Sequence, residues 1–343
     1  MKKLIYFIII VLVFTACTNQ DQLFDDYPVK SIYFPFQYPV RTLSLGNDRL
    51  DNSLDKQHKF NIGVNVGGYY NENKKNWTVN FEIDNSMVID YLVNAKGDTL
   101  KILPGSYYSL NPGSTVIIPK GSFAGLIEVQ LQDAFFQDPE AIKGTYVIPL
   151  RIKDTPDDAE IIRGIPSENV VSPNIHIATD WEITPRDYTL FGVKYVNPYH
   201  GSWLKRGKLL VKDGLGNPVD TVIYRTQNVE FDIVTELTTT KLNQVSGTLN
   251  IGTEKWNLLL DVDNSKNIVV GTGAGSPIHV SGTGKYVENG DTWGGTPENP
   301  TPRDVLYLNY SYTRSNGNVC EVSDTLVFRD RGIKMEEARP AIK

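Results

Sequence analysis

The stretch Trp77-Thr78-Val79-Asn80-Phe81-Glu82-Ile83 decides the fold class, because apolar and polar residues alternate in it without a break. A period of two is typical of a β-strand that buries one face and exposes the other. The same period returns in residues 127–132 and 146–152, and turn clusters such as Asn111-Pro112-Gly113 separate these runs. The first half of the chain is therefore predicted to be all-β, as a β-sandwich of about seven strands.

The second half consists of further strand-like runs joined by short, glycine-marked connections. Asp213-Gly214 and Asn316-Gly317 are hairpin signals between such runs. Closely spaced strands favour an antiparallel meander that closes into a β-barrel, and a flattened sandwich is the alternative. The stretch 154–173, rich in Pro, Asp and Ser, interrupts the periodicity. We place the boundary near Asp187, with residues 28–187 as the sandwich and residues 188–343 as the barrel-like domain.

The first residues have the three parts of a secretory signal. Lys2 and Lys3 are followed by an apolar run over residues 4–14 and then by Thr15, Ala16 and Cys17. Phe14-Thr15-Ala16-Cys17 resembles the lipobox that lipoprotein signal peptidase cuts. We therefore expect residues 1–16 to be a lipoprotein signal peptide, Cys17 to be lipidated and residues 17–27 to form a tether to the membrane. A plain signal peptide is the alternative.

The composition excludes some functions. The chain has a formal net charge of −6 and no basic block, which argues against nucleic acid as a partner. Its four histidines are scattered, without HExxH spacing, and no Gly-x-Ser-x-Gly elbow is present. No pair of carboxylates stands out as a hydrolytic pair. The sequence thus predicts a protein that is not an enzyme and has no cofactor, with a glycoside hydrolase as the weaker alternative.

A glycan site needs aromatic rings for the apolar faces of the sugar, and amides or carboxylates for its hydroxyl groups. A Trp among glycines in a predicted long loop fits this requirement, although such a Trp could instead plug one end of the barrel. A second loop-like stretch and a pair of tyrosines after Gly67-Gly68 offer the same chemistry. The candidates are Trp293, Asp291 and Asn289, then Tyr199, His200 and Trp203, and then Tyr69 and Tyr70.

Metal ligands are sparse in the sequence. Asp261 and Asp263 supply oxygen atoms after a strand and form a weak calcium candidate, but they lack the longer EF-hand spacing. A strand end followed by an Asx turn is the ordinary interpretation of such a run. With Cys17 lipidated, Cys320 stands alone, so a zinc site built on paired cysteines is not available.

Several stretches together resemble a family of two-domain surface lipoproteins from Bacteroidetes. They include Tyr38-Pro-Val-Arg-Thr-Leu-Ser-Leu-Gly46, Tyr146-Val-Ile-Pro-Leu-Arg-Ile152, Asp187-Tyr-Thr-Leu-Phe-Gly-Val-Lys-Tyr195 and Asn197-Pro-Tyr-His-Gly201. The resemblance implies an N-terminal domain of unknown function with an immunoglobulin-like sandwich and a C-terminal lipocalin-like β domain. It also implies a SusE/SusF-like role in polysaccharide-utilisation loci, beside SusC/SusD-type importers.

The sequence and the resemblance together lead to one functional expectation. We expect a lipoprotein of the outer membrane that faces the cell exterior and binds glycans without catalysis for a SusC/SusD-type uptake system. Its expected partners are an oligo- or polysaccharide, the SusC/SusD-type complex, and the membrane through the lipid anchor. The alternative is a structural or adhesion lipoprotein whose β domains bind other proteins, and an open apolar strand edge would favour it.

Overall fold

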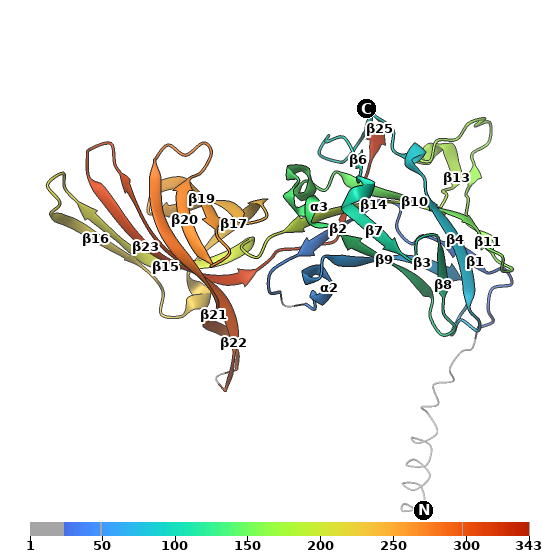
Figure 1. The fold of residues 1–343 in the computed structure, drawn as a ribbon, viewed down its shortest axis with the longest axis horizontal. Helices are drawn as coiled ribbons and strands as arrows, with labels where there is room; N and C mark the ends of the chain where they lie inside the picture. Colours follow the sequence, from blue (N-terminus) through green and yellow to red (C-terminus); the bar gives the residue numbers. More distant parts are fainter. Residues whose placement is uncertain (1–23, 49, 297, 343) are drawn as a thin grey trace, which may run out of the picture.

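The computed structural model describes residues 24–342 except positions 49 and 297. The predicted signal peptide and Cys17 lie outside these residues. The chain forms two β domains side by side, as Figure 1 shows, and the fold class is confirmed as all-β. No helix in the described part is long and apolar enough to cross a membrane.

The first domain is built on two facing sheets. The smaller sheet has the order β11-β1-β3-β9-β7, and the larger has the order β24-β2-β14-β10-β4-β8, with β6 added on β10. The strands of the smaller sheet are β11 (Glu160–Ile161), β1 (Ser31–Tyr33), β3 (Lys59–Gly67), β9 (Ala124–Leu131) and β7 (Tyr108–Asn111). Those of the larger sheet are β24 (Glu336–Glu337), β2 (Pro39–Ser44), β14 (Tyr188–Val196), β10 (Tyr146–Asp154), β4 (Trp77–Ile83), β8 (Thr115–Ile118) and β6 (Lys101–Ile102).

Alternating residues from the two sheets form the core of this domain. Ile62 and Val64 of β3 and Ile127 of β9 belong to the same buried cluster as Val79 and Phe81 of β4. These are the positions at which the alternation in sequence predicts burial, so the period-two signal here reflects sheet-on-sheet packing.

Short elements complete the first domain. A second buried cluster, which includes Met87, Leu92, Tyr188 and Ala338, covers the other face of the larger sheet. The additional strands and helices are β5 (Leu92–Val93), β12 (Ile165–Pro166), β13 (Trp181–Ile183), β25 (Ala341–Ile342), α2 (Ser53–Lys56), α3 (Asp133–Gln137), η1 (Asn85–Met87), η2 (Gly105–Tyr107), η3 (Pro139–Ile142) and η4 (Ala178–Asp180).

The second domain is a closed antiparallel barrel of eight strands, which confirms the barrel over the flattened sandwich. Pairing between β15 and β23 closes it, and the ninth strand, β16, lies beside β15 only. The elements are β15 (Gly201–Lys212), β16 (Pro218–Tyr224), η5 (Val229–Phe231), β17 (Ile233–Lys241), β18 (Gln244–Ile251), β19 (Glu254–Val262), β20 (Asn267–Thr272), β21 (Val280–Thr296), β22 (Asn299–Thr313) and β23 (Val319–Asp330).

Residues 283–304 differ from the prediction of a long loop. They continue β21 and β22, which form a long hairpin that projects from the barrel (Figure 1). Most side chains of its outer part are exposed, so the sequence has no apolar alternation there to mark a strand.

The domain boundary also differs from the predicted position at Asp187. β14 pairs with β10 and, in parallel, with β2, so it is a strand of the first domain, and the chain crosses at residues 197–200. After β23 the chain returns, and β24 and β25 pair with β2 and β5. The barrel is therefore joined to the first domain by two crossings.

Candidate functional site

The two crossings meet at Arg331, whose guanidinium is buried. Its Nη1 donates to the carbonyl oxygens of Pro198 at 2.5 Å and His200 at 2.6 Å, and its Nε donates to Asn47 O at 3.1 Å. The outgoing crossing, the returning crossing and a loop of the first domain are thus held by one side chain. Hydrogen bonds from a charged donor are among the stronger ones, so the joint is well fixed.

Asp304 of β22 forms a second connection beside this joint. Tyr286 Oη donates to its carboxylate at 2.7 Å, the backbone N–H of Asn289 donates at 3.1 Å, and Asn47 Nδ2 donates at 3.3 Å. Asp304 is 2% exposed. Burial and the hydrogen bond to this carboxylate raise the pKa of Tyr286, so the phenol stays protonated as the donor. Asp304 thereby holds the amide side chain of Asn47 from the first domain and the backbone of Asn289 on β21.

An open cleft lies at this place between the domains, with a volume of about 550 Å³. Its charged groups are two acids and two bases, and Lys56 Nζ donates to Asn47 Oδ1 at 3.0 Å across its floor. Such a set offers donors and acceptors to a polyhydroxylated ligand, and the volume fits a small sugar. The lining residues are Asn47, Asp48, Lys56, Asn289, Thr301, Pro302, Arg303, Asp304 and Phe328.

The structure gathers the first three predicted site residues near this cleft. Asn289 lines it, while Asp291 and Trp293 follow on β21, where Asp291 pairs in register with Arg303. The Arg303 guanidinium lies 4.3 Å from the centre of the Trp293 ring, and Trp293 Nε1 donates to Phe328 O at 2.8 Å. Trp293 also packs against an apolar cluster that includes Leu204. It is half-buried outside the barrel wall, so it neither plugs the barrel end nor offers a free ring.

The second predicted group is not available to a ligand. Tyr199 and Trp203 are 3% and 0% exposed and belong to the barrel core, where Trp203 packs edge-on against Phe328. His200 Nδ1 accepts the backbone N–H of Thr239 at 3.1 Å. Burial, and next the positive charge of Arg331, lower the pKa of His200 to about 4. These three residues hold the joint and the core, which corrects their interpretation as sugar contacts.

Tyr69 and Tyr70 lie in the first domain, away from the cleft. Tyr69 packs against Trp77, and Lys30 Nζ lies 4.7 Å from the centre of its ring. Tyr70 is 47% exposed and packs edge-on against Phe24, which falls within the predicted tether of residues 17–27. This group is an aromatic patch near the start of the described chain and lines no pocket with the other candidates.

The calcium candidates are engaged in a turn. Asp263 accepts from the backbone N–H and from Nδ2 of Asn267, at 2.8 and 3.1 Å, as an Asx turn does. Asp261 accepts from Gln244 Nε2 at 2.8 Å. Among the described residues no group of three or more His, Cys, Asp or Glu gathers as a metal site.

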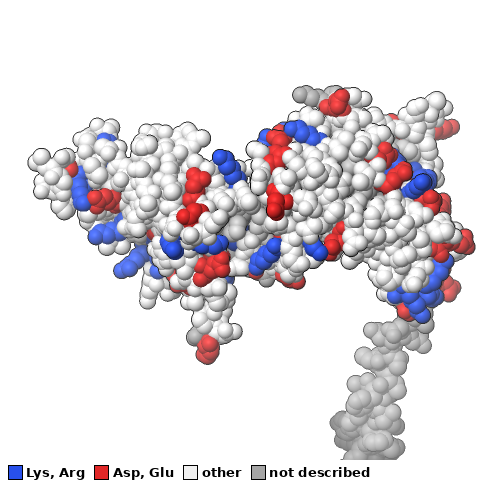
Figure 2. All heavy atoms as spheres, viewed as in Figure 1, with Lys and Arg blue, Asp and Glu red and all other residues white. Residues whose placement is uncertain are grey.

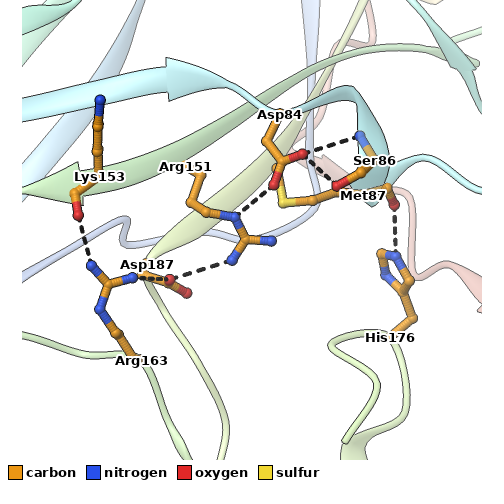
Figure 3. A network of polar contacts seen from close by, with 8 residues as sticks. All are labelled: Asp84, Ser86, Met87, Arg151, Lys153, Arg163, His176 and Asp187. Carbon is orange, nitrogen blue, oxygen red and sulfur yellow. Dashed lines mark hydrogen bonds and ion pairs between the residues drawn. The ribbon is translucent and has the colours of Figure 1, made fainter. Parts of the chain in front are cut away.

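A polar network in the first domain brings two carboxylates, Asp84 and Asp187, to the same arginine (Figure 3). Arg151 bridges Asp84 at 2.7 Å and Asp187 at 3.4 Å, and Arg163 binds Asp187 at 3.2 Å. Burial acts to raise the pKa of Asp84, but hydrogen bonds from Ser86 and Arg151 outweigh it, and the pKa is lowered. Asp84 therefore stays ionised, and its ion pair with Arg151 and those of Asp187 tie β4, β10 and β14 together.

Asp324, inside the barrel, has the raised pKa that a general acid requires. Burial is the cause, since the carboxyl group is 2% exposed. It accepts from Tyr224 and Tyr310 at 2.5 and 2.7 Å. These phenols and the barrel wall separate it from solvent, so no substrate reaches it.

The sequence did not predict most of the residues that line the cleft. Asn47, Asp48 and Lys56 come from the first domain, about 230 residues or more before the candidates on β21. Arg303 and Asp304 were inside the predicted loop without any distinguishing signal. Only the meeting of the two domains makes them neighbours.

Fold and site together define a class: proteins with an N-terminal β-sandwich, a C-terminal eight-stranded barrel and a polar cleft between them. A model described as a domain of unknown function (DUF5627) matches residues 198–332, and a model of an N-terminal domain matches residues 25–159. No curated protein matches the chain.

A crystal structure of a protein of unknown function from Bacteroides ovatus is similar to the whole molecule. It is 34% identical, has a TM-score of 0.80 and is aligned over 93% of this chain and 100% of its own. The chain belongs to the two-domain family that this protein represents. A second structure, of a provisionally assigned carbohydrate binding protein from Bacteroides ovatus ATCC 8483, has a TM-score of 0.27 and 13% identity over 91% of this chain and 100% of its own. That likeness is too low to indicate a shared fold, and the narrower SusE/SusF-like assignment stays a prediction.

Proposed function

We propose that this protein binds glycans without catalysis at the outer surface of the cell, held to the outer membrane through Cys17, for a SusC/SusD-type importer. The observation that carries the proposal is the interdomain cleft, because both domains contribute polar side chains to one open volume of about 550 Å³. A glycan is the class of ligand that matches many neutral and charged hydrogen-bonding groups in an open site.

The chemistry of the cleft favours hydrogen bonding over ring stacking. Lys56 and Asn289 are exposed, whereas Trp293 is covered in part by Arg303. Charge-assisted hydrogen bonds from Lys56 and Arg303 would then supply most of the affinity. A sugar that carries a carboxylate would gain most from these two cations.

A glycan array tests the proposal with the chain from residue 18 onward, which keeps every described residue. We expect binding to at least one oligosaccharide, and a loss of about tenfold or more in affinity for Lys56→Ala combined with Asn289→Ala, since each lost hydrogen bond contributes about 1 kcal/mol. Lys208→Ala, an exposed lysine on β15, is the matched control and keeps full affinity.

The outcomes separate the function from the site. Binding to no glycan at all contradicts the function. Binding that is unchanged in the double variant contradicts the cleft as its location and leaves the class of ligand standing.

The anchor is tested on its own by metabolic labelling with a radioactive fatty acid. We expect label in the full chain and in Cys320→Ala, whose cysteine is buried in the barrel, and none in Cys17→Ser. Label that persists in Cys17→Ser contradicts the lipidation. Protease treatment of intact cells then tests whether the barrel faces the exterior.

A further inference from the structure

β16 is the open edge of the barrel sheet. Among the described residues, every other strand of this sheet pairs on both sides over at least part of its length, because β15 and β23 close the ring, whereas β16 pairs with β15 alone. All residues of β16 except Tyr224 are exposed. An edge of this kind presents a row of unpaired backbone N–H and C=O groups, which an extended chain can bind.

The side chains of β16 protect this edge only in part. Native edge strands are commonly blocked by lysine, by proline or by an inward charge. Pro218–Tyr224 has no basic residue, and its proline and its single acid, Asp220, both lie in the first half of the strand. Val219 and Ile223 are 60% and 62% exposed. Pro218 occupies the end of the strand and leaves the N–H groups of the following six residues in place.

Exposed apolar side chains also precede and follow the strand along the chain. Leu215, in the turn before β16, is 89% exposed, and Phe231, in η5 after it, is 70% exposed. By contrast, acidic and basic side chains are intermingled over much of the face seen in Figure 2. An open edge with several large exposed apolar side chains on and near it in sequence is typical of a surface that becomes covered.

We propose that β16 pairs antiparallel with β16 of a second copy of this chain, about a two-fold axis between the two Thr221 residues. The proposal does not rest on glycan binding. In this register Val219 of one copy lies opposite Ile223 of the other on the outer face, and Asp220 lies opposite Val222, so no like charges meet. The barrel sheets of the two copies become continuous, and one contact removes both open edges.

The register is favoured over its neighbours by charge and length. Centring the pair on Asp220 places two carboxylates opposite each other, which is unfavourable. Centring it on Thr221 pairs all seven residues of the strand, a length of about 24 Å at roughly 3.4 Å per residue. An interface of one strand pair is small, so we expect a dissociation constant in the micromolar range, on the order of that for weak complexes.

Analytical ultracentrifugation of the chain from residue 18 onward tests the dimer over a concentration series. We expect the mass of two chains at high concentration and an increase of at least tenfold in the dissociation constant for Ile223→Lys. Val269→Lys is the matched control, because Val269 is 63% exposed on β20, whose two edges are already paired, and it keeps the dimer. Circular dichroism confirms that both variants are folded.

A cross-link in the full-length chain identifies the register. Thr221→Cys should give a disulfide-linked dimer under oxidising conditions, since the two-fold axis places this position opposite itself. Thr283→Cys, exposed on β21, should give none. A chain that stays monomeric at all concentrations, a dimer insensitive to Ile223→Lys, or the absence of the Thr221→Cys cross-link overturns the proposal.

Discussion

Gly46 lies against the buried guanidinium that joins the two domains. A Cβ atom at this position would come within 2.2 Å of Arg331 Nη2 and 2.7 Å of the Cα atom of Pro198. We expect Gly46→Ala to lower the free energy of unfolding by about 1–3 kcal/mol, as overpacking does. Urea denaturation measures it. Gly113→Ala, where a Cβ meets nothing within 4 Å, is the control, and equal effects in both variants would contradict the steric account.

Protonation of His200, at the joint between the two domains, makes the stability of the protein depend on pH. Its pKa is lowered from 6.5 to about 4 in the folded protein, so the unfolded chain binds the proton first. The contribution of neutral His200 to the free energy of unfolding is therefore complete above about pH 6.5 and is lost as the pH falls towards 4. We expect His200→Gln to reduce the loss of stability between pH 7 and pH 5, measured by urea midpoints. His279→Gln, an exposed histidine, should leave it unchanged; the same slope in His200→Gln and in the parent chain would refute the assignment.

At the residue scale, the sequence predicted which kinds of side chain could contact a ligand better than it predicted where these side chains lie in the fold. It named Asn289 and Trp293 as candidates; Asn289 lines the interdomain cleft, and Trp293 contacts Arg303, which lines it too. It placed Tyr199 and Trp203 in a loop-like stretch, although these two side chains begin the barrel core. Proline and glycine there mark a crossing between domains, which has the same local signal as a surface loop.

At the scale of elements, the C-terminal strands fasten the first domain. Ala338 is 5% exposed, its N–H donates to Tyr38 O, and its carbonyl accepts from Ala95 N, each at 2.9 Å. Lys194 also binds Glu336 at 2.7 Å. We expect removal of residues 333–343 to lower Tm by about 5 °C, for roughly 2 kcal/mol of lost contacts in a domain of this size. Arg339→Ala, in the same segment, is the control, and an unchanged Tm after truncation would contradict this role.

Strands were predictable where they bury one face. β4 and β9 alternate in sequence and in burial, and their positions could be predicted closely. β14 is buried on both faces, with β10 and β2 beside it, so alternation is absent and the boundary was placed before it. The outer parts of β21 and β22 bury little on either face, and they too lacked the signal.

At the scale of the whole molecule, closure of the barrel followed from the number of short strands, but the cleft did not. Segments around residues 47, 56, 289 and 303 form it, and sequence patterns report local burial rather than contacts between distant segments. The −6 net charge also gave no hint of the cleft, because its two acids and two bases balance.

The two crossings make the barrel an insertion whose ends touch. Ser202 pairs with Asp330, and Arg331 contacts Pro198, so the chain leaves the first domain and re-enters it at nearly one point. Replacing residues 198–331 by a short Gly-Ser turn should therefore yield a first domain that still folds, with β14 and β24 in place on β2. Thermal unfolding of that excised variant would show one cooperative transition. The barrel would then be an exchangeable cassette, which can be replaced by another domain while the first domain stays the same.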